Sequence, residues 1–449
     1  MNDIEPAKKP LGFWMCTALL VGNVIGMGIF MLPASLAPYG FNALIGWVIT
    51  VVGCVFIANV FASYARAMPH EDGPYGYTRR AFGNGAAFFV MWCYWISVWI
   101  TNATLAIGIV GYLTVFLPIL THMPVLQPIT ALALIWVFVL VNLRGAHTSG
   151  RVQMVTTILK LLPMFAVMLL GGYILLTDAS AYQAQLPTTP LSLEATAAAG
   201  TIALFAMLGI ECATVPAGKV HDPERTLPRA TMAGTLITAA VYIGVSAIPL
   251  LLIPQAELAL SNAPFADLFV RYWSAGSGLW LALFIIVSGL GALNGWTLIA
   301  GEVTVSFAHH GVFPARFKKH NTSGAPMLAL VLTGVFASLM IVMNYSRSLA
   351  EGFTFMSKVV TAANLPLYLV GSIGLFALWK RGVITASNGK SALLLLSALC
   401  ATLFSIWAFY GIGSESLLWA LALGSLSLPL YAWIKWQRPK PVQLPTTAQ

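Results

Sequence analysis

The stretch GNVIGMGIF, residues 22–30, has the clearest potential for chemistry in this sequence, although it lies inside an apolar run. Gly22, Gly26 and Gly28 interrupt that run, and each glycine in a helix interior costs about 1 kcal/mol relative to alanine. Within a membrane, irregular backbone persists only where protein buries it or where it lines a cavity. The glycines therefore predict two half-helices with an unwound joint, whose unpaired N–H and C=O groups are the parts of transporter substrate sites. The alternative is a close-packing helix face, since Gly22 and Gly26 are four residues apart.

A second interruption of the same kind occurs about 180 residues later, in TIALFAMLGIECATVPAGK. Gly209 and Glu211 fall in the middle of this apolar length, five helices after the first interruption. An odd offset reverses the direction of the second copy, which is the mark of an inverted repeat with discontinuous first and sixth helices. Coincidence is the alternative, because glycine is common in membrane helices.

Composition places these interruptions in a membrane. The chain has 449 residues, of which 59% are hydrophobic and only 8% are charged, whereas a soluble domain carries about 25% charged residues. The net charge of +9 does not indicate a nucleic-acid partner, because the basic residues lie in short connectors. The five cysteines lie in apolar runs and the seven histidines in or beside loops, so neither a disulfide framework nor a metal site is expected.

A spanning helix needs about 20 mainly apolar residues, and twelve segments qualify, which predicts an all-α integral membrane protein with 12 transmembrane helices. If both termini are cytoplasmic, 19 of the 23 lysines and arginines lie in inner connectors, as the positive-inside rule requires. The predicted spans are 11–37, 41–62, 84–112, 126–143, 152–176, 194–216, 230–254, 276–307, 326–344, 352–379, 391–411 and 416–434.

Four motifs in this order resemble the amino acid–polyamine–organocation (APC) superfamily: GNVIGMGIF followed by LPA, GPYGYTRRAFG, KVHDPERTLPRA, and NGWTLIAGE with HHGVFP. The likeness is greatest to bacterial basic amino acid and polyamine antiporters, such as the arginine/agmatine and lysine/cadaverine exchangers. It implies a LeuT-type five-plus-five inverted repeat with broken helices one and six. Residues 1–449 would form a single transporter domain, divided into a first repeat, a second repeat and two extra C-terminal helices at 11–176, 194–379 and 391–434.

The resemblance also assigns substrate contacts to the first break. Val24 and Ile25 would offer carbonyls to an amino group. Gly26, Met27 and Gly28 would offer N–H groups to a carboxylate, at the positive start of a half-helix.

Four further positions would complete the pocket by the same resemblance. Leu208 would offer a carbonyl, Asn102 a side-chain contact from the third helix, and Phe205 and Trp296 aromatic gates. Two residues depart from the arginine exchanger, because Met27 replaces a serine and Phe205 replaces a tryptophan. A phenyl face attracts a cation less well than indole, so the choice between a cationic and a neutral substrate stays open.

Three ionisable residues within predicted spans are candidates for coupling or gating. Lys160 either snorkels to the interface or, as proton-dependent and L-type members imply, stands in place of a sodium ion and tethers helices one and five. Glu211 matches a glutamate that is proposed to sense protons. Lys358 lies on the order of 10 Å below the outer surface, where it either snorkels or places a positive charge in the pocket.

The predicted function is therefore secondary transport of amino acids or their amines by alternating access, in the plasma membrane of a bacterium (the inner membrane). Proton-coupled or facilitative uptake of neutral amino acids is the alternative, and a channel or a non-transporting sensor is the third reading. A channel would show a repeated filter motif or rings of charge, and an enzyme would show a nucleophile–base pair, a phosphate loop or metal-ligand spacing. The sequence shows none of these features, so it favours a transporter over both classes. The expected partners are the small-molecule substrate, protons and lipid, without a cofactor, a metal or nucleic acid; a homodimer stays open.

Overall fold

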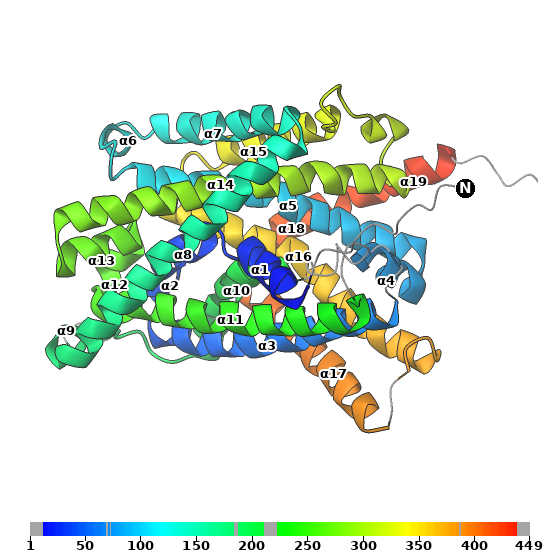
Figure 1. The fold of residues 1–449 in the computed structure, drawn as a ribbon, viewed down its shortest axis with the longest axis horizontal. Helices are drawn as coiled ribbons and strands as arrows, with labels where there is room; N and C mark the ends of the chain where they lie inside the picture. The colour runs from blue at the N-terminus through cyan, green and yellow to red at the C-terminus, as the bar shows by residue number, and fades with distance from the viewer. Residues whose placement is uncertain are drawn as a thin grey trace, which may run out of the picture.

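The computed structural model describes residues 12–68, 71, 73–183, 187–210, 222–385 and 388–437, and these residues are almost entirely helical (Figure 1). Nine helical segments of the described chain are long and apolar enough to cross a membrane. They are α3 (Phe41–Ala67), α5 (Asn84–Leu113), α7 (Leu126–Leu143), α8 (Ala146–Thr177), α11 (Pro223–Leu252), α14 (Ala275–His309), α16 (Leu349–Lys380), α17 (Asn388–Gly411) and the pair α18 (Ser414–Ser425) with α19 (Ser427–Gln437). These segments confirm a multi-pass, all-helical membrane protein and coincide with nine of the predicted spans.

Shorter apolar helices occupy the other three predicted spans. They are α1 (Phe13–Val24) with α2 (Gly28–Leu36), α10 (Leu193–Met207) and α15 (Met327–Met343). The connectors hold η1 (Ala37–Tyr39), α4 (Gly73–Phe82), α6 (Ile119–His122), α9 (Ala179–Gln183), α12 (Gln255–Leu260), α13 (Pro264–Tyr272) and η4 (Ala315–Lys318).

The unwound joint predicted in the first span is confirmed. Helix α1 ends at Val24, Ile25 is extended with φ −70° and ψ 105°, and α2 begins at Gly28. Every residue of α2 is buried, and α1 and α2 lie in the middle of the bundle in Figure 1. The break therefore occurs inside the protein, where irregular backbone is tolerated.

The sixth predicted span is also interrupted at its glycine. Helix α10 ends at Met207, Leu208 is extended, and Gly209 has a φ of 104° that only glycine adopts without strain. The remainder of that span, including Glu211, lies outside the described residues.

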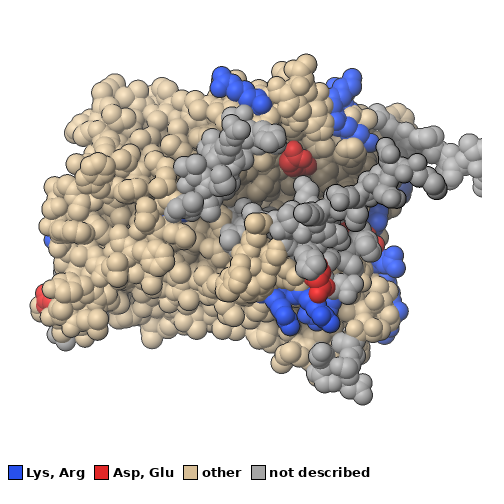
Figure 2. Space-filling model, in the orientation of Figure 1, with Lys and Arg blue, Asp and Glu red and all other residues tan. Residues whose placement is uncertain are grey.

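Burial separates the helices that surround these breaks from those that face lipid. Of the most apolar stretch of each helix, 94% is buried in α5 and 72% in α16, but only 28% in α7 and 11% in the α18–α19 segment. Exposed apolar side chains such as Leu169 and Leu403 cover the outside of the bundle, as expected for helices that contact acyl chains. Figure 2 shows Lys and Arg gathered mainly toward the end of the molecule where α4 and α19 lie.

Candidate substrate-binding site

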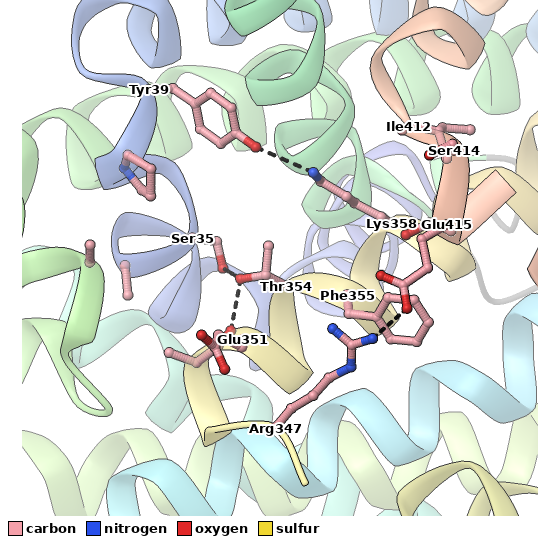
Figure 3. A pocket seen from close by; sticks show the side chains of 16 residues that line it. Ser35, Tyr39, Arg347, Glu351, Thr354, Phe355, Lys358, Ile412, Ser414 and Glu415 are labelled. Atoms are coloured by element: carbon pink, nitrogen blue, oxygen red, sulfur yellow. Dashed lines mark hydrogen bonds and ion pairs between the residues drawn. The ribbon is translucent and has the colours of Figure 1, made fainter. Parts of the chain in front are cut away.

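One cavity in the described chain surrounds Lys358 on α16 and has a volume of about 440 Å³. We call it the Lys358 cavity; α2, η1, α12, α16 and the α17–α18 turn line it. The Lys358 ammonium donates a hydrogen bond to the Tyr39 hydroxyl at 3.2 Å (Figure 3). Lys358 therefore faces this cavity and does not line the smaller one at the helix breaks.

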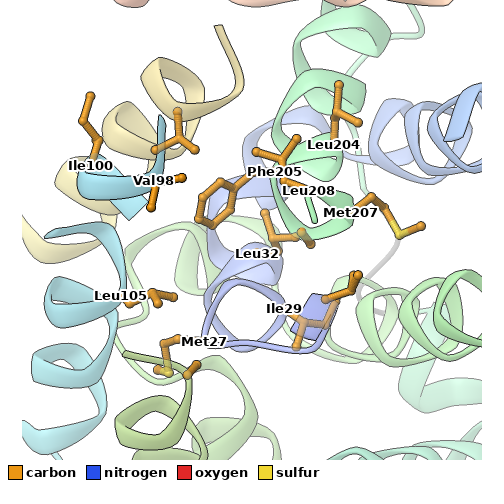
Figure 4. Packing of buried hydrophobic residues seen from close by; sticks show 14 of the residues in the cluster. Met27, Ile29, Leu32, Val98, Ile100, Leu105, Leu204, Phe205, Met207 and Leu208 are labelled. Carbon is orange, nitrogen blue, oxygen red and sulfur yellow. The ribbon is translucent and has the colours of Figure 1, made fainter. Parts of the chain in front are cut away.

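The smaller cavity lies where the two interrupted helices meet, and we call it the break chamber. Its volume is about 20 Å³, which is room for about one water molecule. Figure 4 shows Phe205 and Leu208 at the end of α10, Ile29 on α2 and Leu105 on α5 within the buried apolar region where these helices pack. The lining residues are Val24, Gly26, Gly28, Ile29, Thr101, Leu105, Phe205, Ala206, Leu208 and Trp296.

Two glycines bring the backbone of the first break close to its neighbours. A Cβ atom on Gly28 would lie 3.0 Å from Cε1 of Phe205, so the aromatic ring rests directly on the first residue of α2. A Cβ atom on Gly26 would meet only the Cβ of Ala292, at 3.6 Å. At the start of α2 the Phe30 N–H donates to the Met27 carbonyl at 3.2 Å, whereas the N–H groups before it precede the first bond of the helix. The helix dipole makes this end attractive to an anion.

Met27 points away from the break chamber. A Cβ on Gly108 of α5 would lie 2.9 Å from Met27 Cγ, and a Cβ on Gly289 of α14 would lie 2.9 Å from Met27 Sδ. The thioether therefore fills a slot between two glycine backbones, fully buried. The bulk of Met27 therefore occupies the seam between α5 and α14, and Met27 is not among the lining residues of the chamber.

Thr101 and Leu105, one turn apart on α5, line the break chamber in the place that the sequence assigned to Asn102. Asn102 is buried on the adjacent face, and its Oδ1 atom has no hydrogen-bond partner in the described part of the chain. Ile25 is buried as well and does not line the chamber. The remaining predicted residues, Phe205, Leu208 and Trp296, do line it.

Comparison with known proteins identifies the family of this chain. Residues 11–426 match the family described as amino acid permease. The chain belongs to the amino acid permease family.

Three relatives resemble the permease over most of their length. A putative arginine/ornithine antiporter of Bacillus subtilis is 32% identical over 398 residues, which cover 82% of this chain and 84% of the relative. The putrescine transporter PotE of Haemophilus influenzae is 28% identical over 432 residues, covering 96% and 98%. A cadaverine/lysine antiporter of Escherichia coli K12 is 32% identical over 350 residues, covering 76% and 77%.

The carbonyl end of α1 in the permease is held by two other helices. Lys160 of α8, which is 1% exposed, donates to the Gly22 carbonyl at 2.9 Å. The Tyr242 hydroxyl of α11 donates to the Val24 carbonyl at 3.0 Å. The contact of Lys160 with the first helix follows the sequence expectation, but Tyr242 has no feature in the sequence that distinguishes it from other tyrosines in apolar helices.

Helix α2 connects the break chamber with the Lys358 cavity of the permease. Gly28 and Tyr39 are eleven residues apart, or about 16 Å at 1.5 Å per residue. Phe205 of the chamber packs edge-on against Phe353 of α16, with ring centroids 5.8 Å apart. Ser35 and Thr354 share a hydrogen bond of 2.7 Å near the other end of α2. Movement of α2 against α16 would therefore change both cavities.

Proposed function

We propose that this permease is a secondary transporter that exchanges amino acids or their amines across the plasma membrane by alternating access. The observation that carries the proposal is the break chamber, where the ends of two interrupted helices meet. A half-helix N-terminus favours an anion and exposed carbonyls favour a cation, so together they suit the carboxylate and amino group of an amino acid. The names of the three relatives support this substrate class.

The proposed complex uses backbone groups on both sides of the first break. The N–H groups of Gly26, Met27 and Gly28 bind the substrate carboxylate, and the carbonyls of Val24 and Ile25 bind the amino group. A chamber of about 20 Å³ does not hold an amino acid. The helices around it must separate to admit one, which is the motion that alternating access requires.

Aromatic and polar side chains complete the proposed complex. Phe205 contacts the substrate with its ring face and Trp296 seals the site, while Leu208 adds a carbonyl from the end of α10. Asn102, with its unpartnered buried oxygen, becomes a substrate contact when α5 and α2 separate.

The proposed architecture is a five-plus-five inverted repeat with twelve membrane spans. Its support is the position of the two interruptions: the helix breaks between α1 and α2 in the first span, and α10 ends at Met207, two residues before Gly209, in the sixth. Residues 11–176 and 194–379 form the repeats, and 391–434 form two additional helices. The end rich in Lys and Arg in Figure 2 faces the cytoplasm of a bacterial cell, together with both termini. The Lys358 cavity, at the opposite end of α16 from Lys380, then opens outward.

Coupling is assigned to Lys160 and Glu211. The buried ammonium of Lys160 supplies one positive charge beside the end of α1, so no sodium ion is needed there. Glu211 exchanges a proton as the chamber opens and closes. If Lys160 remains charged throughout and Glu211 takes no part, the same fold performs exchange without net proton movement.

Uptake of neutral amino acids is the second candidate function. The break chamber favours it in one respect, because its described lining residues include no charged side chain. A cationic side chain would therefore find ring faces, carbonyls and the Thr101 hydroxyl among them, but no carboxylate.

Substrate binding and transport by the purified protein test the proposal. Ligands that bind the folded state raise its melting temperature, so basic amino acids and diamines should do so, and proteoliposomes should exchange one for the other. If neutral amino acids alone give a shift and are transported, the second candidate replaces the first. If no amino acid or amine is bound or transported, the substrate class is wrong.

A further inference from the structure

Four charged side chains line the Lys358 cavity, and two of them are committed to each other. Arg347 pairs with Glu415 at 2.5 Å, and its guanidinium also lies 4.3 Å from the centre of the Phe355 ring. A guanidinium held by a carboxylate and an aromatic face has little remaining attraction for a ligand. Lys358 and Glu351 are the other two.

Lys358 has no acidic partner among the described residues. Its ammonium donates to the Tyr39 hydroxyl and lies 5.8 Å from the centre of that ring. Both contacts orient the ammonium without neutralising it. A partly buried cation without a counter-charge, at the wall of a large cavity, attracts an anionic group.

Glu351 supplies the opposite charge two helical turns away. It precedes Lys358 by seven residues on one face of α16, or about 10 Å along the axis. Its carboxylate accepts a hydrogen bond from the Ser348 backbone N–H at 3.2 Å, and no ion pair involves it in the part of the chain that the structure describes. A carboxylate has further acceptor sites, so Glu351 remains able to bind a cation. Figure 3 shows Thr354 between these two residues at the cavity wall.

The spacing selects a ligand with a carboxylate at one end and a cation at the other. In an extended basic amino acid, several single bonds of about 1.5 Å each separate these two groups, so the molecule can direct one toward Lys358 and the other toward Glu351. A diamine of the same length would place a cation against Lys358. A volume of 440 Å³ is in the usual range for a small-molecule site.

We propose that the Lys358 cavity is a second substrate site, which binds a basic amino acid through its carboxylate before the amino acid enters the break chamber and which disfavours the corresponding diamine. This proposal rests on the proposed function and on the outward orientation of the cavity. It assigns to Lys358 a direct contact with the carboxylate, and to Glu351 a contact with the side-chain cation. The break chamber then receives amino acids preferentially from this side.

Ornithine and putrescine make a matched pair of probes, because they differ by one carboxylate. Transport is measured in proteoliposomes with each probe on the outer face, for wild type, Lys358→Met and Lys380→Met. The control removes a lysine from the exposed opposite end of the same helix. Lys358→Met should raise the KM for ornithine by about tenfold, the loss of one charge-assisted hydrogen bond, and should leave the KM for putrescine unchanged or lower. Lys380→Met should change neither, and Lys358→Arg should retain the preference for ornithine.

Equal effects of Lys358→Met on both probes, or no effect on either, would overturn the proposal while leaving the proposed function intact. A wild-type protein that transports neither probe nor any other amine or amino acid removes both. If Lys358→Met does not fold, Glu351→Gln at the exposed start of α16 tests the proposal instead. This variant should raise the KM for ornithine several-fold, and an unchanged KM would refute the site.

Discussion

The break chamber and the Lys358 cavity lie at the two ends of one segment, from Gly28 to Tyr39, yet they are built from different chemical groups. The described lining of the chamber offers backbone atoms, ring faces, apolar side chains and the Thr101 hydroxyl around about 20 Å³. The Lys358 cavity offers four charged side chains around about 440 Å³. Full charges are costly where a substrate must be stripped of water, whereas backbone dipoles are already fixed by the fold. If both cavities bind substrate as proposed, the difference assigns ionic selection to the open cavity and close backbone recognition to the closed one.

The largest effect should come from a side chain placed in the chamber. Gly26→Leu should abolish substrate binding, because Gly26 lines a space of about 20 Å³ that four additional carbon atoms would fill. The variant should fold, since its Cβ meets only Ala292 at 3.6 Å. Gly172→Leu on α8 is the control, because nothing lies within 4 Å of a Cβ there. Isothermal titration of both variants measures the effect, and undiminished binding by Gly26→Leu would remove the chamber from the transport path.

The second-largest effect is expected from Lys160, whose ammonium contacts the carbonyl end of α1. Lys160→Ala leaves the Gly22 carbonyl without its donor inside the protein, and an unsatisfied buried group costs about 1–3 kcal/mol. We expect transport to fall by roughly one to two orders of magnitude, with Lys380→Ala unaffected. Wild-type transport should continue when choline replaces sodium. Strict dependence on sodium would contradict the coupling proposal, and full activity in Lys160→Ala would show that the tether is dispensable.

A smaller effect is expected at Trp296, and it should show whether this residue acts in closing the chamber or in binding the substrate. Trp296→Leu should lower the turnover number by about tenfold while changing KM much less, if the indole mainly seals the occluded state. Trp280→Leu on the same helix is the control, because that side chain is 66% exposed. Initial rates over a range of substrate concentrations distinguish the two parameters. A rise in KM with constant turnover would make Trp296 a binding residue instead.

The smallest effect belongs to a carboxyl group that lines neither cavity. Burial raises the pKa of Asp267 on α13 above its ordinary value, although the Ser261 hydroxyl, which donates to it, opposes the shift. The folded state therefore holds this proton to higher pH than the unfolded state, and stability falls as pH rises through the raised pKa. Asp267→Asn should remove this decline in melting temperature, which sets in as pH rises above the ordinary Asp pKa of about 4. Transport should be the same in variant and wild type, and identical melting profiles would refute the assignment.

The sequence predicted the helices and the breaks better than the directions of side chains. Apolar length located the spans, and the cost of glycine in a helix located the joint at residues 25–27 and, to within two residues, the end of α10 at Met207. The face of a helix on which a side chain lies depends on how the helix is rotated about its axis, which the sequence does not determine. A step of one residue turns the side chain about that axis by about 100°. That is why the neighbour Thr101, and not Asn102, lines the chamber.

Residues in the unwound joint have no helical period from which a direction can be read. The outward turn of Met27 into the seam between α5 and α14 was therefore beyond sequence reasoning, as was the hydroxyl of Tyr242 at Val24. The sequence left open whether Lys358 faces a cavity, and only its hydrogen bond to Tyr39 of η1 shows which cavity it faces.

The slot that holds Met27 has a consequence for how related permeases diverge. Its thioether touches the space above Gly108 and Gly289, so any larger residue at either position collides with it, at 2.9 Å in both cases. The size of Met27 and the absence of a side chain at Gly108 are therefore coupled, although the two positions lie in different helices. A smaller residue in place of Met27 would leave the slot underfilled and would make room for a Cβ at Gly108. It would not make room at Gly289, where Cγ1 of Ile109 would still lie 2.7 Å from an added Cβ. A change at Met27 alone creates a void and a change at Gly108 alone creates a clash, so these two positions should vary together.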